Sequence, residues 1–272
     1  MLVVKMHLED KEGKALVDHY KIKGFPSIVF VDKDSLEIDR IIGYRPPDEF
    51  LEELKRIQSG EGTIPNLIDR TTQDPNNVEL WMALAEKYED RGDLGSTLET
   101  WESISEAKIG EAQLTDYKII ELKSRINSDV TELQNYVINN LDSEYTSQAF
   151  RNIITIQRYS KDKEGEGASW LKYLNYIELK ELGSAQFYNS FAWRMSELEQ
   201  NLELALNKIR LGITMVAIDD SSTQAGYKDT KAEILWKMGR TEEAIKVIDE
   251  CIKLQPDDQY FKDQRDKFLS SK

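Results

Sequence analysis

The chain has 272 residues, of which 40% are hydrophobic, and this is enough to build packed cores and excludes a disordered tail. Its 50 acidic residues outnumber 36 Lys and Arg residues, and the formal net charge of -14 disfavours nucleic acid as a partner, because a phosphate backbone has the same sign. The single cysteine excludes an internal disulfide. The sequence contains no run of about eighteen apolar residues that would predict a membrane span.

The N-terminal residues are expected to alternate between strands and helices. Residues 2–8 predict a strand and not a signal peptide, because they have neither a basic start nor a long apolar core. A helix is expected over residues 11–20. The chain is then broken by Gly24, Phe25 and Pro26. The apolar run 27–31 that follows is typical of a strand covered on both faces.

A hairpin and a helix are expected next. Residues 32–35 predict a turn between the strand at 27–31 and a second strand over 36–42, and Gly43 ends that strand. Pro46 and Pro47 are expected to open a helix with acidic residues in its first turn. The apolar face of this helix is expected to carry Phe50, Leu51, Leu54 and Ile57.

This order of elements resembles the C-terminal part of a thioredoxin over about residues 2–58. Residues 4–6 resemble the central strand of that family, residues 20–27 its cis-proline loop, and residues 41–44 the glycine-bearing end of its last strand. The resemblance implies a cis peptide bond between Phe25 and Pro26. It also implies contact with a polypeptide at Gly24, Phe25, Pro26, Gly43 and Tyr44. The alternative is that the proline only shapes the fold.

The sequence departs from the thioredoxin pattern at its start. No Cys-x-x-Cys motif and no earlier strands precede these elements, and the missing strand would leave two edges unpaired, at about 1–3 kcal/mol for each buried group. We expect Met1 to be an internal methionine of a longer protein, which the upstream genomic DNA would test. The alternative is a genuine half domain, docked against the helices or against a partner strand.

Residues 59–63 are small and polar and predict a linker, and the sequence beyond Asn66 has only helical periodicity. The expected fold is therefore an incomplete α/β thioredoxin-like segment followed by an all-α helical repeat array of the tetratricopeptide type. The expected division is a partial thioredoxin-like domain at 1–59, a linker and first short helix at 60–73, and the repeat domain at 74–272.

The clearest repeat begins at Ala225. In the tetratricopeptide pattern of about 34 residues, small residues recur where paired helices touch, glycine occupies the turn and proline ends the unit. The matching residues are Ala232, Gly239, Ala244, Cys251 and Pro256. Gly239 is expected to end one helix, and Thr241 to begin the next as its N-cap.

Two further copies begin at Val78 and Gln186. The first is supported by Trp81, Leu84, Ala85, Tyr88, Gly92 and Trp101, and the second by Asn189, Ala192, Trp193, Asn201 and Ala205. Residues 111–182 predict degenerate helix pairs, because they keep the helical period without the small residues. Residues 257–269 predict a polar helix that caps the array.

Several residues that could carry chemistry have simpler structural interpretations. Cys251 occupies a small buried repeat position, and His7 and His19 match no metal-ligand spacing. Asp32 and Asp34 predict a hairpin turn and not a calcium loop, because Glu37 stands where such a loop needs glycine. The pairs at 219–220 and 257–258 are expected to cap helices, and most Trp and Tyr side chains to pack in the core. No catalytic, metal or cofactor residue is assigned.

The first helix of each pair is expected to line a concave groove that takes up polypeptides. In the copy that begins at Val78, this face would carry Glu79, Met82, Glu86 and Glu89, which favours a basic or amphipathic partner. The alternative is a solvated acidic face. A paired lysine and asparagine clamp for a terminal carboxylate is not evident.

These patterns predict a non-catalytic scaffold for protein interaction. The alternative is a fragment of a thiol–disulfide oxidoreductase or redox-linked chaperone whose dithiol lies upstream, with a role in redox homeostasis. A third hypothesis is an assembly factor that binds a nascent or envelope protein. The compartment is unknown; the resemblance suggests a soluble bacterial protein of the cytoplasm or periplasm.

Overall fold

The computed structural model describes residue 7 and residues 9–270. The chain forms two compact units, Met1–Ala149 and Phe150–Lys272, and each is described by itself. The strand expected over residues 2–8 lies outside the described residues, apart from His7.

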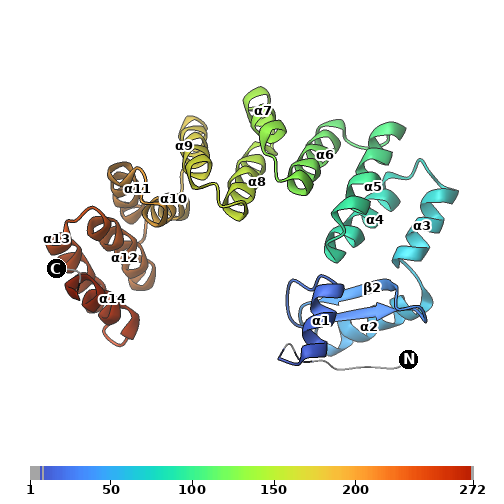
Figure 1. The fold of residues 1–272 in the computed structure, drawn as a ribbon, viewed down its shortest axis with the longest axis horizontal. Coiled ribbons are helices and arrows are strands. Elements are labelled where there is room, and N and C mark those ends of the chain that lie inside the picture. The colour runs from blue at the N-terminus through green and yellow to red at the C-terminus, as the bar shows by residue number, and fades with distance from the viewer. Residues whose placement is uncertain (1–6, 8, 271–272) are drawn as a thin grey trace. The chain divides into compact units, whose positions relative to one another are not determined.

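The first unit begins with a small α/β segment (Figure 1). Its elements are α1 (Lys11–His19), β1 (Ser27–Val31), β2 (Glu37–Ile42) and α2 (Pro47–Ser59). The two strands form an antiparallel hairpin, in which Ser27 is opposite Ile42. The turn between them is closed by the Asp32 carboxylate, which accepts the backbone N–H groups of Asp34 at 2.8 Å and Leu36 at 2.9 Å, so the hairpin prediction is confirmed.

Two expectations about this segment are wrong. The strand β1 is not covered on both faces, since Ile28 and Val31 are exposed. Val31 is the last residue of β1 and lies beside the turn, where the pairing with β2 skips Ile38. In α2, Ile57 is buried as expected, but Leu51 is exposed, because it lies at the edge of the apolar stripe.

The first unit continues with helices only. They are α3 (Ile64–Gln73), α4 (Val78–Arg91), α5 (Leu94–Ala107), α6 (Ala112–Asn127) and α7 (Thr131–Asn139). Helices α4 and α5 form the pair of the repeat that begins at Val78, and buried Ala85, Trp101, Ile104 and Leu122 join this pair to α6. The repeat pattern therefore places small and large apolar residues at the helix contacts as predicted.

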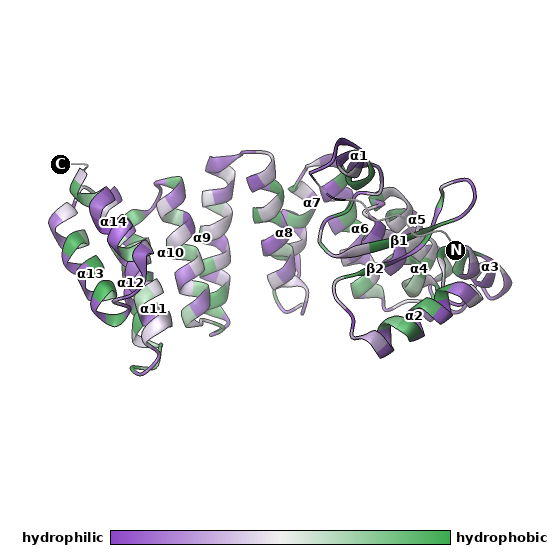
Figure 2. Cartoon of the chain, turned by 90° about the horizontal axis from the view of Figure 1, so that it is seen from below, coloured by the Kyte–Doolittle hydropathy of each residue, from purple (hydrophilic) through white to green (hydrophobic). Residues whose placement is uncertain are grey.

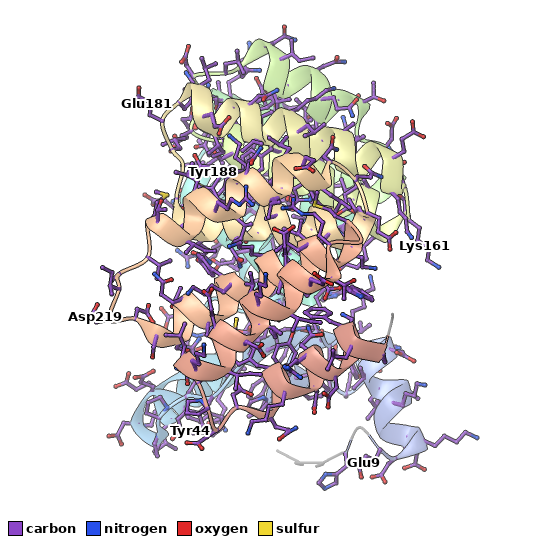
Figure 3. The ribbon with its side chains drawn as sticks, turned by 90° about the vertical axis from the view of Figure 1, so that its left-hand side faces the viewer. Glu9, Tyr44, Lys161, Glu181, Tyr188 and Asp219 are labelled. Atoms are coloured by element: carbon purple, nitrogen blue, oxygen red, sulfur yellow. The ribbon has the colours of Figure 1, made fainter. Side chains whose placement is uncertain are left out.

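Helix α8 (Thr146–Tyr159) contains the division between the two units, and the second unit continues from it. The remaining helices are α9 (Lys163–Leu179), α10 (Ala185–Leu198), α11 (Leu202–Thr214), α12 (Ser221–Lys237), α13 (Thr241–Leu254) and α14 (Gln259–Ser270). Figure 3 shows Glu181 and Asp219, in the loops after α9 and α11, on one edge of this unit and Lys161, in the loop before α9, on the other. The helices thus alternate in direction, as in stacked helix pairs.

One apolar core runs from Leu174 of α9 through α10 to α14. Its fully buried members include the predicted small residues Ala192, Ala205, Ala232, Ala244 and Cys251. In Figure 2 the helices show hydrophobic and hydrophilic residues in alternation along their turns, which is the pattern of helices buried on one side. The small residues let paired helices approach closely, which explains why the period was visible in the sequence.

The turns of the repeats also follow local rules, with one correction. Gly92 and Gly239 adopt φ of +71° and +75°, a conformation that favours glycine, after α4 and α12. Thr241, however, is the first helical residue of α13 and not its N-cap. The N-cap is Arg240, whose guanidinium instead bonds the Glu243 carboxylate at 2.8 Å, one turn into the helix.

Candidate functional site

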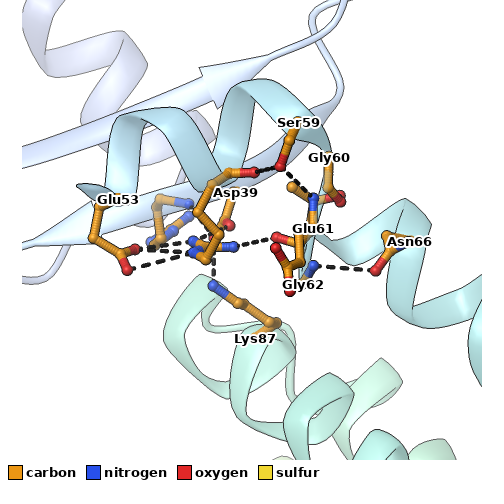
Figure 4. Close-up of polar contacts among 11 residues, drawn as sticks. Asp39, Glu53, Ser59, Gly60, Glu61, Gly62, Asn66 and Lys87 are labelled. Atoms are coloured by element: carbon orange, nitrogen blue, oxygen red, sulfur yellow. Dashed lines mark hydrogen bonds and ion pairs between the residues drawn. The ribbon is translucent and has the colours of Figure 1, made fainter. Parts of the chain in front are cut away.

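The α/β segment is fixed to the first repeat by a group of charges around one buried carboxylate, which we call the Asp39 cluster (Asp39, Glu53, Arg56 and Lys87). The Asp39 carboxylate accepts from Arg56 Nη2 at 2.7 Å and from Lys87 Nζ at 2.6 Å (Figure 4). The Asp39 side chain is 0% exposed, and those of Arg56 and Lys87 are 24% and 23% exposed. A buried carboxylate is stable only when paired, so α2 and α4 each contribute one of the cations that it needs.

Arg40 makes a second connection between the same elements. Its buried guanidinium bonds both oxygens of Glu37, at 2.6 Å and 2.7 Å. It also donates to the backbone carbonyls of Tyr20 at 2.8 Å and Asp90 at 3.0 Å. Since these carbonyls follow α1 and end α4, Arg40 ties both helices to β2.

Residues 59–63, which were expected to form a linker, are held by hydrogen bonds. Arg56 Nη1 donates to the Glu61 carbonyl at 2.6 Å, and the Gly62 N–H donates to the Asn66 side chain at 3.1 Å (Figure 4). Burial opposes the charge of Arg56, but hydrogen bonds to Glu53 and Asp39 outweigh it and raise the pKa of the guanidinium. The α/β segment and the repeats are therefore joined by ordered structure in this unit.

A hollow of about 440 Å³ lies on the face of α4 that leads toward α5 and α6. The structure brings all four predicted groove residues, Glu79, Met82, Glu86 and Glu89, to its lining. Trp101 forms part of the wall, and the Met82 side chain is 40% exposed. The hollow therefore combines an accessible apolar surface with several carboxylates, and we call it the repeat groove.

The carboxylates of the repeat groove differ in their surroundings. Glu89 is close to two cations, Lys118 Nζ at 3.7 Å and Arg125 Nη1 at 3.2 Å. Among the residues that the structure describes, Glu79 and Glu86 have no ion-pair partner on the protein. The negative charge of the groove is thus compensated at Glu89 and remains uncompensated at Glu79 and Glu86.

The residues expected to touch polypeptide at the proline loop also come together. The Phe25–Pro26 peptide bond is cis, and the Gly43 N–H donates to the Pro26 carbonyl at 2.8 Å. Gly24 accepts the Ser27 hydroxyl at 2.7 Å, and the side chains of Phe25 and Tyr44 are exposed. This face, which we call the proline-loop face, does not line the repeat groove.

Other candidate residues have structural surroundings. Cys251 is buried, and burial raises the pKa of its thiol to about 12, which makes a thiolate unfavourable. His7 and His19 are exposed. Asp220 accepts the Thr223 N–H as the N-cap of α12, as expected. Within the described residues, no cluster of three His, Cys, Asp or Glu side chains could hold a metal, and no helix has the length and hydropathy to cross a bilayer.

Sequence reasoning missed the Asp39 cluster. Its members are 48 residues apart at their widest, from Asp39 to Lys87, and no local spacing links them. The available signal was the presence of Glu37, Asp39 and Arg40 in a strand that packs against helices, since charges in such a strand need partners.

Comparison with known proteins identifies two parts of the chain. Residues 4–58 match the model of a thioredoxin-like domain, and residues 226–258 match a tetratricopeptide repeat. No curated protein matches the chain.

Among solved structures, one similar chain comes from the crystal structure of the APC/C hetero-tetramer Cut9–Hcn1. It is 12% identical with a TM-score of 0.38, over 79% of this chain and 40% of that chain. A likeness at this level carries no argument about function.

The match at 226–258 covers most of α12 and all of α13, the pair in which Ala232, Ala244 and Cys251 are buried. The match at 4–58 covers the hairpin, its flanking helices and the loop at Pro26. The chain is thus a fusion of a thioredoxin-like segment with helical repeats of the tetratricopeptide type.

Proposed function

We propose that this chain is a non-catalytic scaffold that binds a basic, amphipathic polypeptide segment in the repeat groove. The observation that carries the proposal is the pairing of exposed Met82 with the unpartnered carboxylates of Glu79 and Glu86 in one hollow. An apolar contact flanked by opposite charges is the kind of surface that takes up an amphipathic segment.

The spacing on α4 defines the partner further. Glu79 and Glu86 are two turns apart on the helix, about 10 Å, because an α-helix rises about 1.5 Å per residue. A polypeptide in the polyproline II conformation covers about 9 Å in three residues, at about 3.1 Å each, and with three residues per turn it places side chains i and i+3 on the same side. Two cationic side chains three residues apart, with an apolar side chain between them, would complement Glu79, Met82 and Glu86.

Two features support a role without catalysis. The thiol of Cys251 is buried in the second unit and its pKa is raised to about 12, so it is a poor nucleophile. Tetratricopeptide repeats and thioredoxin-like segments both offer surfaces for polypeptides, and the proline-loop face adds a second exposed surface to the first unit. The proposed division is 1–59 for the thioredoxin-like part, 60–73 for the turn and first helix, and 74–272 for the repeats.

The experiment is a fluorescence anisotropy titration with a fluorescein-labelled peptide that contains Lys-Leu-Ser-Lys. A matched peptide with Glu in place of both Lys residues is the control ligand. We expect the basic peptide to bind and to weaken as salt rises, since exposed charges are screened. The double substitution of Glu79→Gln and Glu86→Gln should weaken it about tenfold, whereas Glu106→Gln, at an exposed site on α5 outside the groove, should not.

Equal binding of the acidic peptide, or full affinity in the double variant, would contradict the proposed partner. Catalysis is tested separately by reduction of insulin in the presence of dithiothreitol. The chain should not raise the rate above that of dithiothreitol alone, and a clear acceleration would contradict the non-catalytic assignment.

A further inference from the structure

A second hollow, of about 370 Å³, lies where the thioredoxin-like segment meets α4. Ile42 and Arg45 line it from the end of β2 and the loop that follows, and Lys87 and Asp90 line it from α4. Glu86 lines both this hollow and the repeat groove. The two hollows therefore meet at one side chain, and we call the second one the junction hollow.

The groups that remain available in the junction hollow are few and mixed in character. Lys87 is engaged by Asp39, and Arg40 by Glu37. Among the described residues, the exposed guanidinium of Arg45 has no ion-pair partner, and neither has the exposed carboxylate of Asp90. Ile42 is 41% exposed and supplies an apolar surface. The junction hollow thus adds a positive charge and an apolar contact to the acidic face of α4.

One face of α4 runs along both hollows. Glu79, Glu86 and Asp90 are separated by seven and four residues, about two turns and one turn, so they share that face. The three positions span about 16 Å at 1.5 Å per residue, which a polypeptide in the same polyproline II conformation covers with about five residues, at about 3.1 Å each. A single short segment is long enough to reach from Glu79 to the junction hollow.

The walls of the junction hollow are fixed before a ligand arrives. Lys87 bonds the fully buried Asp39 of β2, and Arg40 donates to the carbonyl of Asp90. These contacts hold β2 against the C-terminal half of α4 by partly buried, charge-assisted hydrogen bonds. A surface that is already ordered loses little conformational freedom on binding.

We propose that one polypeptide segment occupies both hollows, with basic side chains at Glu79 and Glu86 and, beyond them, an apolar residue at Ile42 and an acidic residue at Arg45. The segment is therefore dipolar, basic at one end and acidic at the other, and the thioredoxin-like part selects its acidic end. This inference rests on the proposed function, because it extends a segment bound in the repeat groove.

The test compares a short probe with longer ones. The short probe is the labelled Lys-Leu-Ser-Lys peptide. In one long probe Gly-Val-Glu follows this peptide, and in the other Glu-Val-Gly precedes it. Both are used because the direction of the bound segment is part of the question. We expect one long probe to bind wild type at least fivefold more tightly than the short probe. Arg45→Glu should remove this gain and leave the affinity for the short probe within twofold of wild type.

A charge swap and a matched control complete the design. With Arg45→Glu, the long probe that bound wild type more tightly should recover the fivefold gain when its Glu is replaced by Lys. Lys55→Glu, a charge reversal at an exposed site of α2 outside both hollows, should behave as wild type with every probe. Circular dichroism of each variant verifies that the helices are retained.

The inference is overturned if neither long probe binds more tightly than the short one, or if Arg45→Glu binds both as wild type does. Failure of the short probe to bind wild type is a different result, since it contradicts the proposed function and the inference together.

Discussion

Asp39→Asn should break the connection between the thioredoxin-like segment and the first repeat. The substitution keeps the size of the side chain but removes the charge that faces Arg56 Nη2 at 2.7 Å and Lys87 Nζ at 2.6 Å. Removal of one partner of a buried ion pair costs about 3–5 kcal/mol. Because Arg56 and Lys87 keep about a quarter of their surface in solvent, we expect the lower end of this range, about 3 kcal/mol.

The assay is hydrogen–deuterium exchange followed by mass spectrometry, which measures the opening of separate segments and not the unfolding of the whole chain. A loss of about 3 kcal/mol corresponds to about 100-fold faster exchange, since each 1.4 kcal/mol is a factor of ten. This acceleration should appear in β2 and in the C-terminal half of α4. Helices α12 to α14 lie in the other unit and should exchange as in wild type.

The control is Asp34→Asn in the hairpin turn. Asp34 also pairs with a lysine, Lys33 at 2.9 Å, but the two side chains are 62% and 88% exposed. An exposed pair contributes less than about 1 kcal/mol. If Asp39→Asn accelerates exchange in β2 and α4 no more than Asp34→Asn does, the assigned role of the Asp39 cluster is refuted.

Three further predictions concern the second unit. The Cys251 thiol should resist Ellman's reagent at pH 8 in the folded chain and react fully in guanidinium chloride, since burial raises its pKa to about 12; rapid reaction of the folded chain would contradict this. Burial, opposed by a hydrogen bond from Tyr260, raises the pKa of Asp229 to about 6, so the folded chain binds this proton more tightly than the unfolded one. The free energy of unfolding should therefore fall as pH rises from about 4 to 6. Asp229→Asn should remove that fall and stabilise the unit at pH 7.5 by up to about 3 kcal/mol, measured by urea titration. A variant less stable than wild type at pH 7.5 would contradict this prediction. Burial opposes ionisation of Glu166, but hydrogen bonds from Arg194, at 2.7 Å to each oxygen, and Arg158 outweigh it and lower the pKa of the carboxyl. Glu166→Gln should thus cost about 3 kcal/mol at pH 7, and the difference from wild type should shrink as the pH falls below about 4; a difference independent of pH would refute the linkage.

The helical repeats could be predicted from the sequence because their signals are local. Ala232, Gly239 and Ala244 mark helix contacts and a turn within one unit, and each of these positions follows from spacing along a single helix pair. The groove on α4 was predictable for the same reason, since Glu79, Met82 and Glu86 share a helical face.

The junction between the two parts could not be predicted, because it depends on contacts between distant residues. Nothing in the spacing of Asp39 and Lys87 shows that they meet, and the pairing appears only when β2 is packed against α4. The exposure of Ile28 and Val31 was missed for a related reason, since an apolar run does not show which of its residues another element covers. The error at Thr241 is smaller, because helix ends are the least certain part of such a prediction.

Photo-crosslinking tests the binding of a basic polypeptide in the repeat groove most directly. Benzoylphenylalanine replaces Met82 in the groove or, as a control, Ile138, an exposed residue of α7 outside it. With the biotinylated Lys-Leu-Ser-Lys probe, we expect an adduct at position 82 that disappears in 0.5 M salt, at about 4 Å screening length, and little adduct at position 138. Equal adducts at both positions, or none at position 82, would contradict the account.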